Sequence, residues 1–214
     1  MIIGIDEAGR GCIIGPMVLC AAAINPLEEY KLKELGVRDS KRLSPKQREG
    51  LFPKVASLCR CAVVKVSARE LNTLMASSNL NEIEAQKAAF AIDELSFTGA
   101  TAYIDSPDNV PANFAKRVEK YLKTKTRLVS ANKADDKYLI VGAASIIAKV
   151  TRDAEIEKIK REVGVDFNSG YTSDQITMGI IGKRKEYPKL EPYLRTRWST
   201  LSPENKKQKK LGEF

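Results

Sequence analysis

The chain has 214 residues, which is enough for one sizeable domain with a short extension. It contains 36 Lys and Arg against 27 Asp and Glu, so its formal charge is +9 at pH 7. This charge suits a polyanionic partner such as nucleic acid, although it also serves solubility alone. The sequence has no histidine, which excludes Ser-His-Asp and Cys-His catalysis and HExxH metal sites, and leaves any chemistry to carboxylates, lysines or metal ions.

Hydrophobic periodicity and turn residues predict alternating strands and helices in the first half of the chain. A strand, a tight glycine-rich turn and a second strand are expected over residues 1–24. Ser44 followed by Pro45 is a favourable helix start. The other elements expected here are helices over 28–35 and 45–57, a strand over 59–68, a short helix capped by Ser67, and a helix over 81–97.

The second half continues the alternation and then changes character. Its expected elements are strands over 101–105 and 126–131, and helices over 109–123 and over roughly the last two-thirds of 133–164. From about residue 166 a polar loop, a short helix and several prolines follow. We therefore predict an α/β catalytic domain over 1–165, a helical C-terminal extension over 166–205 and a basic flexible tail over 206–214.

We expect a cytoplasmic protein without membrane contact. The first apolar run has no basic leader and meets Asp6 at once, unlike a signal peptide, and no apolar run reaches the roughly 18 residues that span a bilayer. The four cysteines complete no zinc motif, and we interpret them as reduced, buried thiols.

Acidic residues follow three of the predicted strands. Asp6 and Glu7 follow the first, Asp105 ends the fourth, and Asp135 and Asp136 come after the fifth. In open α/β sheets functional groups gather beyond the carboxyl ends of strands, and neighbouring strands lie about 4.8 Å apart. Clustered carboxylates repel one another unless cations neutralise them, and hard oxygen ligands select Mg²⁺ or Mn²⁺. Two such ions can clamp the attacking and leaving oxygens of a phosphoryl displacement.

Each acid also has a simpler interpretation, which we favour when it is taken singly. Asp6 and Glu7 would be ordinary polar residues at a strand end, and Asp105 would belong to a turn. Asp135 and Asp136 would cap the following helix. Their joint placement at three strand ends, in a basic protein without histidine, favours a metal site.

Four motifs resemble those of ribonuclease HII, the type 2 ribonuclease H family, in order and spacing. They are GIDEAGRG (4–11), DSKRLS (39–44), YIDSPD (103–108) and KADDKYLIVGAASIIAKVTRD (133–153). The match covers most of residues 1–175, and the C-terminal part is most similar to archaeal members. The resemblance implies the ribonuclease H-like fold, a central five-stranded mixed sheet flanked by helices.

The resemblance also implies an activity and a set of catalytic residues. The family cleaves the RNA strand of RNA–DNA hybrids and single ribonucleotides embedded in duplex DNA, and leaves 5′-phosphate and 3′-hydroxyl ends. Its four acids correspond to Asp6, Glu7, Asp105 and Asp135, which would hold two Mg²⁺ or Mn²⁺ ions, with Asp6 bridging both. Asp135 is chosen over Asp136 by its register with AASIIAKV, and Asp136 is the second choice.

The Gly9-Arg10-Gly11 triplet corresponds to the family's reader of the 2′-hydroxyl group. Glycines let backbone groups approach a small sugar hydroxyl without an intervening Cβ atom. A tight turn that requires glycine is the simpler interpretation, and both can hold, because the turn would place the backbone.

Further substrate contacts follow from the same resemblance. Tyr171 matches the tyrosine that stacks on the deoxyribose after the ribonucleotide, although Thr172 stands where archaeal members usually have proline. Lys41 and Ser145 match backbone-phosphate contacts. The simpler interpretations are a packing tyrosine, a solvated lysine and a helix-packing serine. Arg197 replaces a serine common in the family, and no function follows from it.

The C-terminal tail matches a sliding-clamp-binding peptide as closely as it matches a disordered basic tail. Gln208, Leu211 and Phe214 have the spacing of a peptide that binds the sliding clamp (PCNA), although the second aromatic residue of that motif is absent. Two other functions compete with the nuclease interpretation. A Holliday-junction resolvase of the same fold would share the acids without needing Gly9-Arg10-Gly11, and a non-catalytic nucleic-acid adaptor would only recruit the clamp. We expect a monomer.

Overall fold

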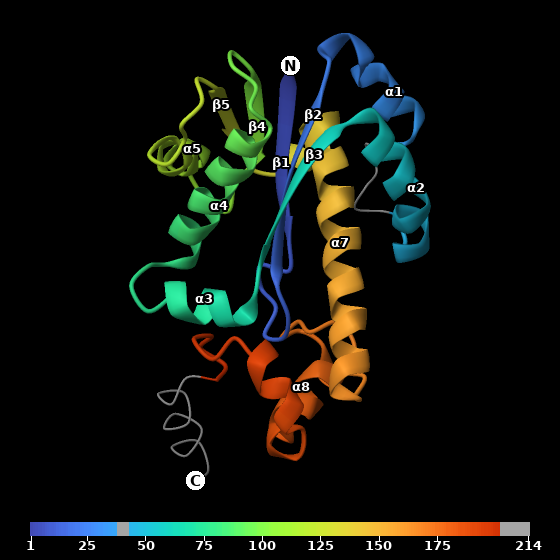
Figure 1. Ribbon diagram of the computed structural model, residues 1–214, viewed down its shortest axis with the longest axis vertical. Coiled ribbons are helices and arrows are strands. Elements are labelled where there is room, and N and C mark those ends of the chain that lie inside the picture. The colour runs from blue at the N-terminus through green and yellow to red at the C-terminus, as the bar shows by residue number, and fades with distance from the viewer. Residues whose placement is uncertain (38–42, 202–214) are drawn as a thin grey trace. The chain divides into compact units, whose positions relative to one another are not determined.

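The computed structural model describes residues 1–37 and 43–201 (Figure 1). They form two compact units, which are described separately below. The first unit contains Met1–Ala8, Val18–Lys65 and Asn79–Thr151. The second contains Gly9–Met17, Val66–Ser78 and the residues from Arg152 onward. The chain passes repeatedly from one unit to the other, and the predicted division into a catalytic domain and an extension near residue 165 stays a prediction.

The first unit is built on a five-stranded mixed sheet, as predicted. Its strands are β1 (Ile2–Ala8), β2 (Met17–Ile24), β3 (Arg60–Val66), β4 (Thr101–Asp105) and β5 (Arg127–Ala131), in the order β3-β2-β1-β4-β5. β1 pairs with β2 in antiparallel fashion and with β4 in parallel, and β4 and β5 are also parallel. The carboxyl ends of β1, β4 and β5 therefore meet at the same edge of the sheet.

Helices cover both faces of this sheet. One face packs against α1 (Glu29–Glu34), α2 (Pro45–Leu58) and the first half of α7 (Leu139–Val163), and their shared core includes Cys20, Ala22, Val55, Ile140 and Ala144. Figure 1 shows α4 (Leu80–Glu94) and α5 (Pro111–Glu119) on the other side of the sheet. Because β1 and β2 are covered on both faces, their sequences are almost continuously apolar or small.

Helix starts follow the capping residues in the sequence. Ser44 and Gln47 form a reciprocal capping box at the start of α2, where the Ser44 N–H donates to Gln47 Oε1 at 2.8 Å. Ser67 caps α3 (Ala68–Leu74), and Asn79 caps α4. The region after β5 differs from the prediction, because a separate short helix, α6 (Ala134–Lys137), precedes an α7 that is longer than expected.

The second unit surrounds a smaller core. It contains α3, the end of α7, α8 (Gln175–Gly182) and two 3-10 helices, η3 (Arg184–Glu186) and η4 (Pro188–Tyr193). The glycine-rich turn after β1 belongs to this unit, since Ile13 and Ile14 pack against Ile156, Phe167 and Leu190. Isolated β-bridges join Cys12 to Tyr171 and Ile14 to Leu194.

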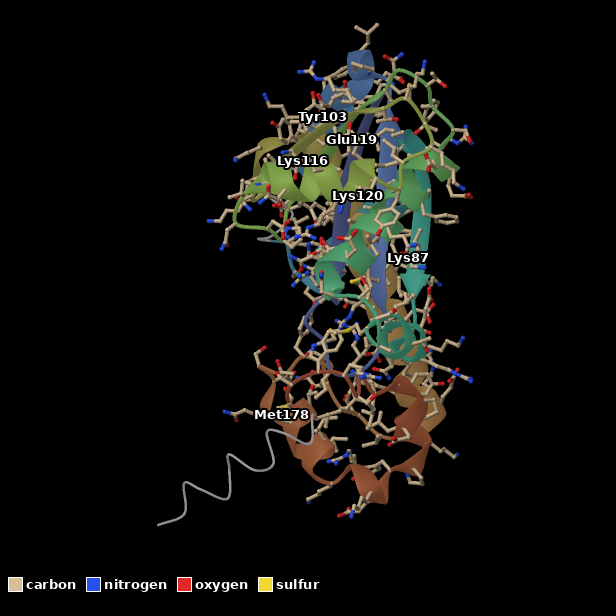
Figure 2. The ribbon with its side chains drawn as sticks, turned by 90° about the vertical axis from the view of Figure 1, so that its left-hand side faces the viewer. Lys87, Tyr103, Lys116, Glu119, Lys120 and Met178 are labelled. Carbon is tan, nitrogen blue, oxygen red and sulfur yellow. The ribbon has the colours of Figure 1, made fainter. Side chains whose placement is uncertain are left out.

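Basic side chains project from the surface of the first unit. Lys116 lies on α5, Lys120 is the residue directly after this helix, and both are exposed (Figure 2). The four cysteines carry free thiols, and only Cys61 is partly exposed. Within residues 1–37 and 43–201, no helix is sufficiently long and apolar to cross a lipid bilayer.

Candidate active site

Asp6 lies near the carboxyl end of β1 and is almost completely buried. Its Oδ2 lies 3.7 Å from Lys149 Nζ, and its Oδ1 accepts the Glu7 backbone N–H at 2.9 Å. Burial raises the pKa of Asp6, and the nearby Asp135 carboxylate adds to this shift. Lys149, a hydrogen bond from Ser145 and the Glu7 N–H oppose it. A cation close to Asp6 therefore stabilises its ionised form.

Asp105 ends β4, the strand beside β1, and lies on the same face of the sheet as Asp6. The paired register of β1 and β4 ends one residue before both acids, so they follow at the same level. Asp105 Oδ1 accepts the backbone N–H of Ala134 at 2.6 Å. This bond fixes the first residue of α6, and the next residue is Asp135.

The two candidates for the fourth acid differ in exposure. Asp135 is buried and interacts electrostatically with Asp6, whereas Asp136 is exposed. Both acids line a pocket of about 290 Å³ together with Lys33, Lys137 and Leu139. The position of Asp135 near Asp6 agrees with the choice made from sequence register, and its role as a ligand stays a prediction.

Glu7 follows Asp6 directly on β1 and is half-buried. The structure brings Asp6, Asp105 and Asp135 together at one edge of the sheet. The role of Glu7 as a fourth ligand stays a prediction.

The acids have the donor chemistry of a magnesium or manganese site, since all their ligand atoms are carboxylate oxygens. In the part of the chain that the structure describes, no group of three or more Asp, Glu, Cys or His side chains is arranged as a metal site. The acids therefore fit a hard metal ion because they offer carboxylate oxygens and lie at the same edge of the sheet. Their side chains are not already arranged around a common ion position.

Lys149 is a site residue that the sequence interpretation missed. It lies four residues after Ser145 on α7, and residues at this spacing share a helix face. Ser145 is fully buried, and its hydroxyl accepts a hydrogen bond from Lys149 Nζ. The predicted contact between Ser145 and a phosphate group stays a prediction, because here the hydroxyl contacts Asp6 and Lys149.

The glycines of the triplet in the second unit have different structural requirements. Gly9 has φ +77°, and a Cβ atom there would lie 2.6 Å from the Pro16 carbonyl oxygen, so the turn requires glycine at this position. Gly11 has no positive φ, and a Cβ atom there would meet no protein atom within 4 Å among the described residues. The local fold thus explains Gly9 and does not explain Gly11.

Tyr171 is joined directly to the turn. Its hydroxyl accepts the Gly9 N–H at 3.2 Å, and burial raises the pKa of the phenol, which keeps it protonated at neutral pH. The Arg152 guanidinium carbon lies 4.7 Å from the centre of the Tyr171 ring. One face of the ring is therefore occupied by Arg152, and the predicted stacking on a deoxyribose concerns the other face and stays a prediction.

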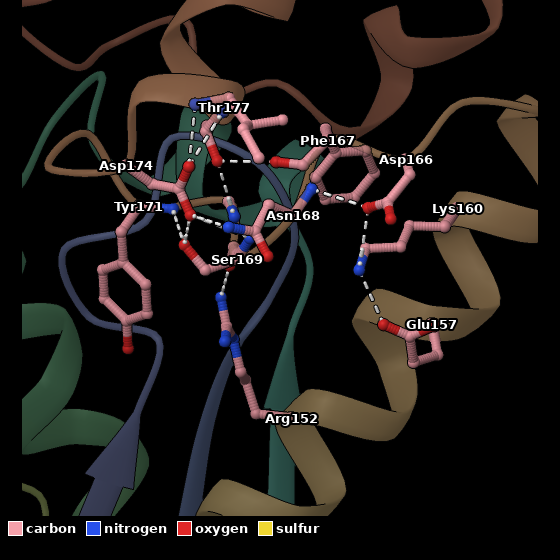
Figure 3. A network of polar contacts seen from close by, with 12 residues as sticks. Arg152, Glu157, Lys160, Asp166, Phe167, Asn168, Ser169, Tyr171, Asp174 and Thr177 are labelled. Carbon is pink, nitrogen blue, oxygen red and sulfur yellow. Dashed lines mark hydrogen bonds and ion pairs between the residues drawn. The ribbon is translucent and has the colours of Figure 1, made fainter. Parts of the chain in front are cut away.

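A dense hydrogen-bond network holds the loop that contains Tyr171 (Figure 3). Asp174 Oδ2 accepts from Asn168 Nδ2 and from Ser169 Oγ, each at 2.6 Å, and Asp174 Oδ1 accepts two N–H groups at the start of α8. Thr177 Oγ1 donates to the Phe167 carbonyl at 2.7 Å. These bonds fix the loop conformation with threonine at position 172.

Two buried arginines of the second unit were also missed. Arg152 donates to the Ser169 carbonyl oxygen and to Cys12 Sγ, and Arg195 donates to carbonyl oxygens of the glycine-rich turn. No local sequence pattern distinguishes either residue from a surface arginine, because their partners are distant in sequence. The remaining predicted site residues, Lys41, Gln208, Leu211 and Phe214, lie outside the described residues and stay predictions.

Comparisons with known proteins agree with this arrangement. The sequence model of the family Ribonuclease HII matches residues 3–201. Ribonuclease HII of Archaeoglobus fulgidus is 43% identical over 211 residues, which cover 99% of this chain and 98% of that protein.

Two solved structures extend the similarity to three dimensions. The PCNA:RNase HII complex of Archaeoglobus fulgidus has a TM-score of 0.85 and 42% identity, covering 93% of this chain and 95% of that one. Bst-RNase HIII in complex with Mn²⁺ has a TM-score of 0.79 and 25% identity, covering 99% of this chain and 70% of that one. The chain thus belongs to the ribonuclease HII family of metal-dependent hydrolytic nucleases, which have the ribonuclease H fold and act on RNA–DNA hybrids.

Proposed function

We propose that this chain is an endoribonuclease that cleaves both the RNA strand of hybrids and single ribonucleotides embedded in duplex DNA, leaving 5′-phosphate and 3′-hydroxyl ends. The observation that carries the proposal is the placement of Asp6, Asp105 and Asp135 on one face at one edge of the sheet. Hydrolysis of a phosphodiester needs charge stabilisation at such a site, and this histidine-free chain offers clustered carboxylates for it.

The proposed cofactor is a pair of Mg²⁺ or Mn²⁺ ions, and the presence of Mn²⁺ in the Bst-RNase HIII structure supports the ion type. Asp6, Glu7, Asp105 and Asp135 would hold them, with Asp6 between the two. When bound, such ions supply Lewis acidity, which lowers the pKa of water and stabilises charge on the leaving oxygen. The burial of Asp6 supports this role, because a buried carboxylate gains most from a neighbouring cation.

Recognition of the ribonucleotide is assigned to the second unit. Gly9, Arg10 and Gly11 would present backbone groups to the 2′-hydroxyl, and Tyr171 would stack on the next deoxyribose. The open space beside Gly11 supports the first role, since a sugar can approach this backbone without meeting a side chain. Lys41 and Ser145 would contact backbone phosphates.

The test uses duplex DNA that carries one ribonucleotide, with an all-DNA duplex as control, both incubated with the protein and Mg²⁺. We expect a single cut at the ribonucleotide and an intact control. Equal cutting of both duplexes would favour a resolvase-like nuclease, and binding without any cut would favour an adaptor.

A sliding clamp is the proposed protein partner. The Archaeoglobus fulgidus relative is seen in complex with PCNA, and the C-terminal spacing of Gln208, Leu211 and Phe214 suits such a contact. Deletion of residues 207–214 is expected to abolish clamp binding in calorimetry while leaving cleavage of the ribonucleotide substrate intact. Unchanged affinity would reject the tail as the binding segment. We expect a cytoplasmic monomer.

A further inference from the structure

Arg195 is a fully buried arginine whose guanidinium group is bound by one turn of the backbone. Nη2 donates to the Gly9 carbonyl at 2.7 Å, Nη1 to the Arg10 carbonyl at 2.8 Å, and Nε to the Gly15 carbonyl at 2.9 Å. The Arg195 backbone N–H adds a bond to the Ile13 carbonyl at 2.9 Å. Four carbonyl groups of the turn are thus fixed by a single residue.

This arrangement is a costly way to hold a turn. In the described part of the chain Arg195 forms no ion pair with a carboxylate, and burial lowers its pKa to about 10, so it remains charged at neutral pH. A buried charge without an opposite charge is unfavourable unless hydrogen bonds compensate it. The planar guanidinium group has five N–H donors in a fixed geometry and can therefore bind several carbonyl groups at once.

The contacts determine where the N–H groups of the triplet point. In a trans peptide the carbonyl and the following N–H point in opposite directions. Because the Gly9 and Arg10 carbonyls point to Arg195, the N–H groups of Arg10 and Gly11 point away from it. Two successive N–H groups on one side form a concave donor pair that suits an oxygen acceptor.

The turn is open at Gly11. A Cβ atom at Gly11 would meet nothing within 4 Å among the described residues, so the protein itself does not require glycine there. Gly9, by contrast, is required by its φ of +77° and by Pro16. The absence of a side chain at Gly11 leaves room for a molecule to approach this backbone from outside.

We propose that Arg195 is a positioning residue for ribonucleotide recognition: it orients the Arg10 and Gly11 N–H groups toward the sugar oxygen of the substrate. This inference rests on the proposed function, because it assigns a cause to the discrimination between ribose and deoxyribose. It goes beyond that function because it names Arg195, which lies 185 positions after Arg10 in the sequence, as the residue that orients the Gly9-Arg10-Gly11 backbone.

The experiment measures discrimination by binding in the Asp6→Asn background, so that no cleavage interferes. Arg195→Lys and Arg195→Met are compared with Arg197→Met, an exposed arginine of the same segment. The readout is the ratio of affinities for a duplex with one ribonucleotide and for the all-DNA duplex. We expect Arg195→Lys and Arg195→Met to lower this ratio at least tenfold at unchanged all-DNA affinity, and Arg197→Met to keep it. A structural defect alone would weaken binding to both duplexes in parallel, and that outcome or an unchanged ratio overturns the proposal.

A second variant keeps the test decisive if substitution of Arg195 prevents folding. Gly11→Ala retains Arg195 and should fold normally, and it should lose the ribonucleotide preference at least tenfold because its methyl group covers the donor pair. Wild-type preference in Gly11→Ala overturns the inference. The proposed function is checked separately by wild-type cleavage with Mg²⁺. If the wild type does not cut at the ribonucleotide, that function fails, whereas a cutting wild type with fully discriminating variants rejects only the role of Arg195.

Discussion

The backbone of Ile140 at the start of α7 lies directly against Gly4 of β1. A Cβ atom at position 4 would be 2.3 Å from the carbonyl carbon and oxygen of Ile140. Only glycine allows this approach, which places α7 on the strand that contains Asp6. The same approach fixes the segment immediately before α7, including Asp135, near the carboxyl end of that strand.

Gly4→Ala is expected to destabilise the protein because two backbone segments would have to separate. Overpacking of a buried contact costs about 1–3 kcal/mol, and backbone atoms cannot move aside as a side chain can. Thermal unfolding measures this loss. Gly50→Ala in α2 is the matched control, since its Cβ atom meets nothing and alanine favours a helix by roughly 0.5–1 kcal/mol. Equal stability of Gly4→Ala and wild type would contradict the contact.

Asp135→Asn is expected to remove cleavage, whereas Asp136→Asn should retain most of it. Asp135 is buried and interacts with Asp6, whereas Asp136 is exposed. The measurement is kcat/KM on a hybrid duplex at saturating Mg²⁺, with binding of the duplex as the control for folding. If Asp136→Asn lost cleavage and Asp135→Asn retained it, Asp136 would be the fourth catalytic acid.

Lys149→Met is expected to tighten the binding of Mn²⁺ by up to about fivefold. The ammonium group lies 3.7 Å from the Asp6 carboxylate and repels a cation that binds there, and such a partly exposed pair contributes about 1 kcal/mol or less. Calorimetry of Mn²⁺ binding in the absence of nucleic acid measures the effect. Lys158→Met, at an exposed position of α7 beside Glu162, serves as the control and should bind Mn²⁺ as the wild type does. Weaker binding by Lys149→Met would show that this lysine does not oppose the cation.

Cys59 is expected to make the protein less stable at alkaline pH. Burial raises the pKa of its thiol to about 12, so between about pH 9 and 12 the unfolded chain loses a proton that the folded chain retains. The free energy of unfolding therefore falls as the pH rises through this window. Denaturant titrations between pH 8 and 10.5 measure how steeply the free energy of unfolding falls with pH. This slope should be smaller for Cys59→Ala than for the wild type, whatever the absolute stability of the variant. Parallel slopes for Cys59→Ala and wild type would reject the assignment.

Local sequence signals predicted the elements that depend on local interactions. The positions of the strands and the helix start at Pro45 are confirmed, because strand patterning and the Ser44 cap act over a few residues. The mixed five-stranded sheet, which the family resemblance implied, is also confirmed. The sequence also predicted that acids at separate strand ends would meet, and the parallel register places Asp6 beside Asp105.

The remaining features depend on contacts between distant residues. Arg195 and the turn around Gly9 are separated by 186 positions, and nothing in LRTRWST marks the first arginine as buried and the second as exposed. The short helix α6 was likewise missed, since its position is fixed by the bond between Asp105 and Ala134. Lys149, by contrast, was predictable, because residues four apart on a helix share one face and Lys149 lies four residues after Ser145.

The separation between Gly9 and Arg195 has a consequence during protein synthesis. Arg195 is translated 186 residues after Gly9, so at about 5–20 residues per second their meeting is delayed by roughly 10–40 s. All five strands and all the candidate acids have been translated before that time. A nascent chain, or one that terminates prematurely before residue 195, would therefore contain every proposed metal ligand but not the arginine that orients the turn.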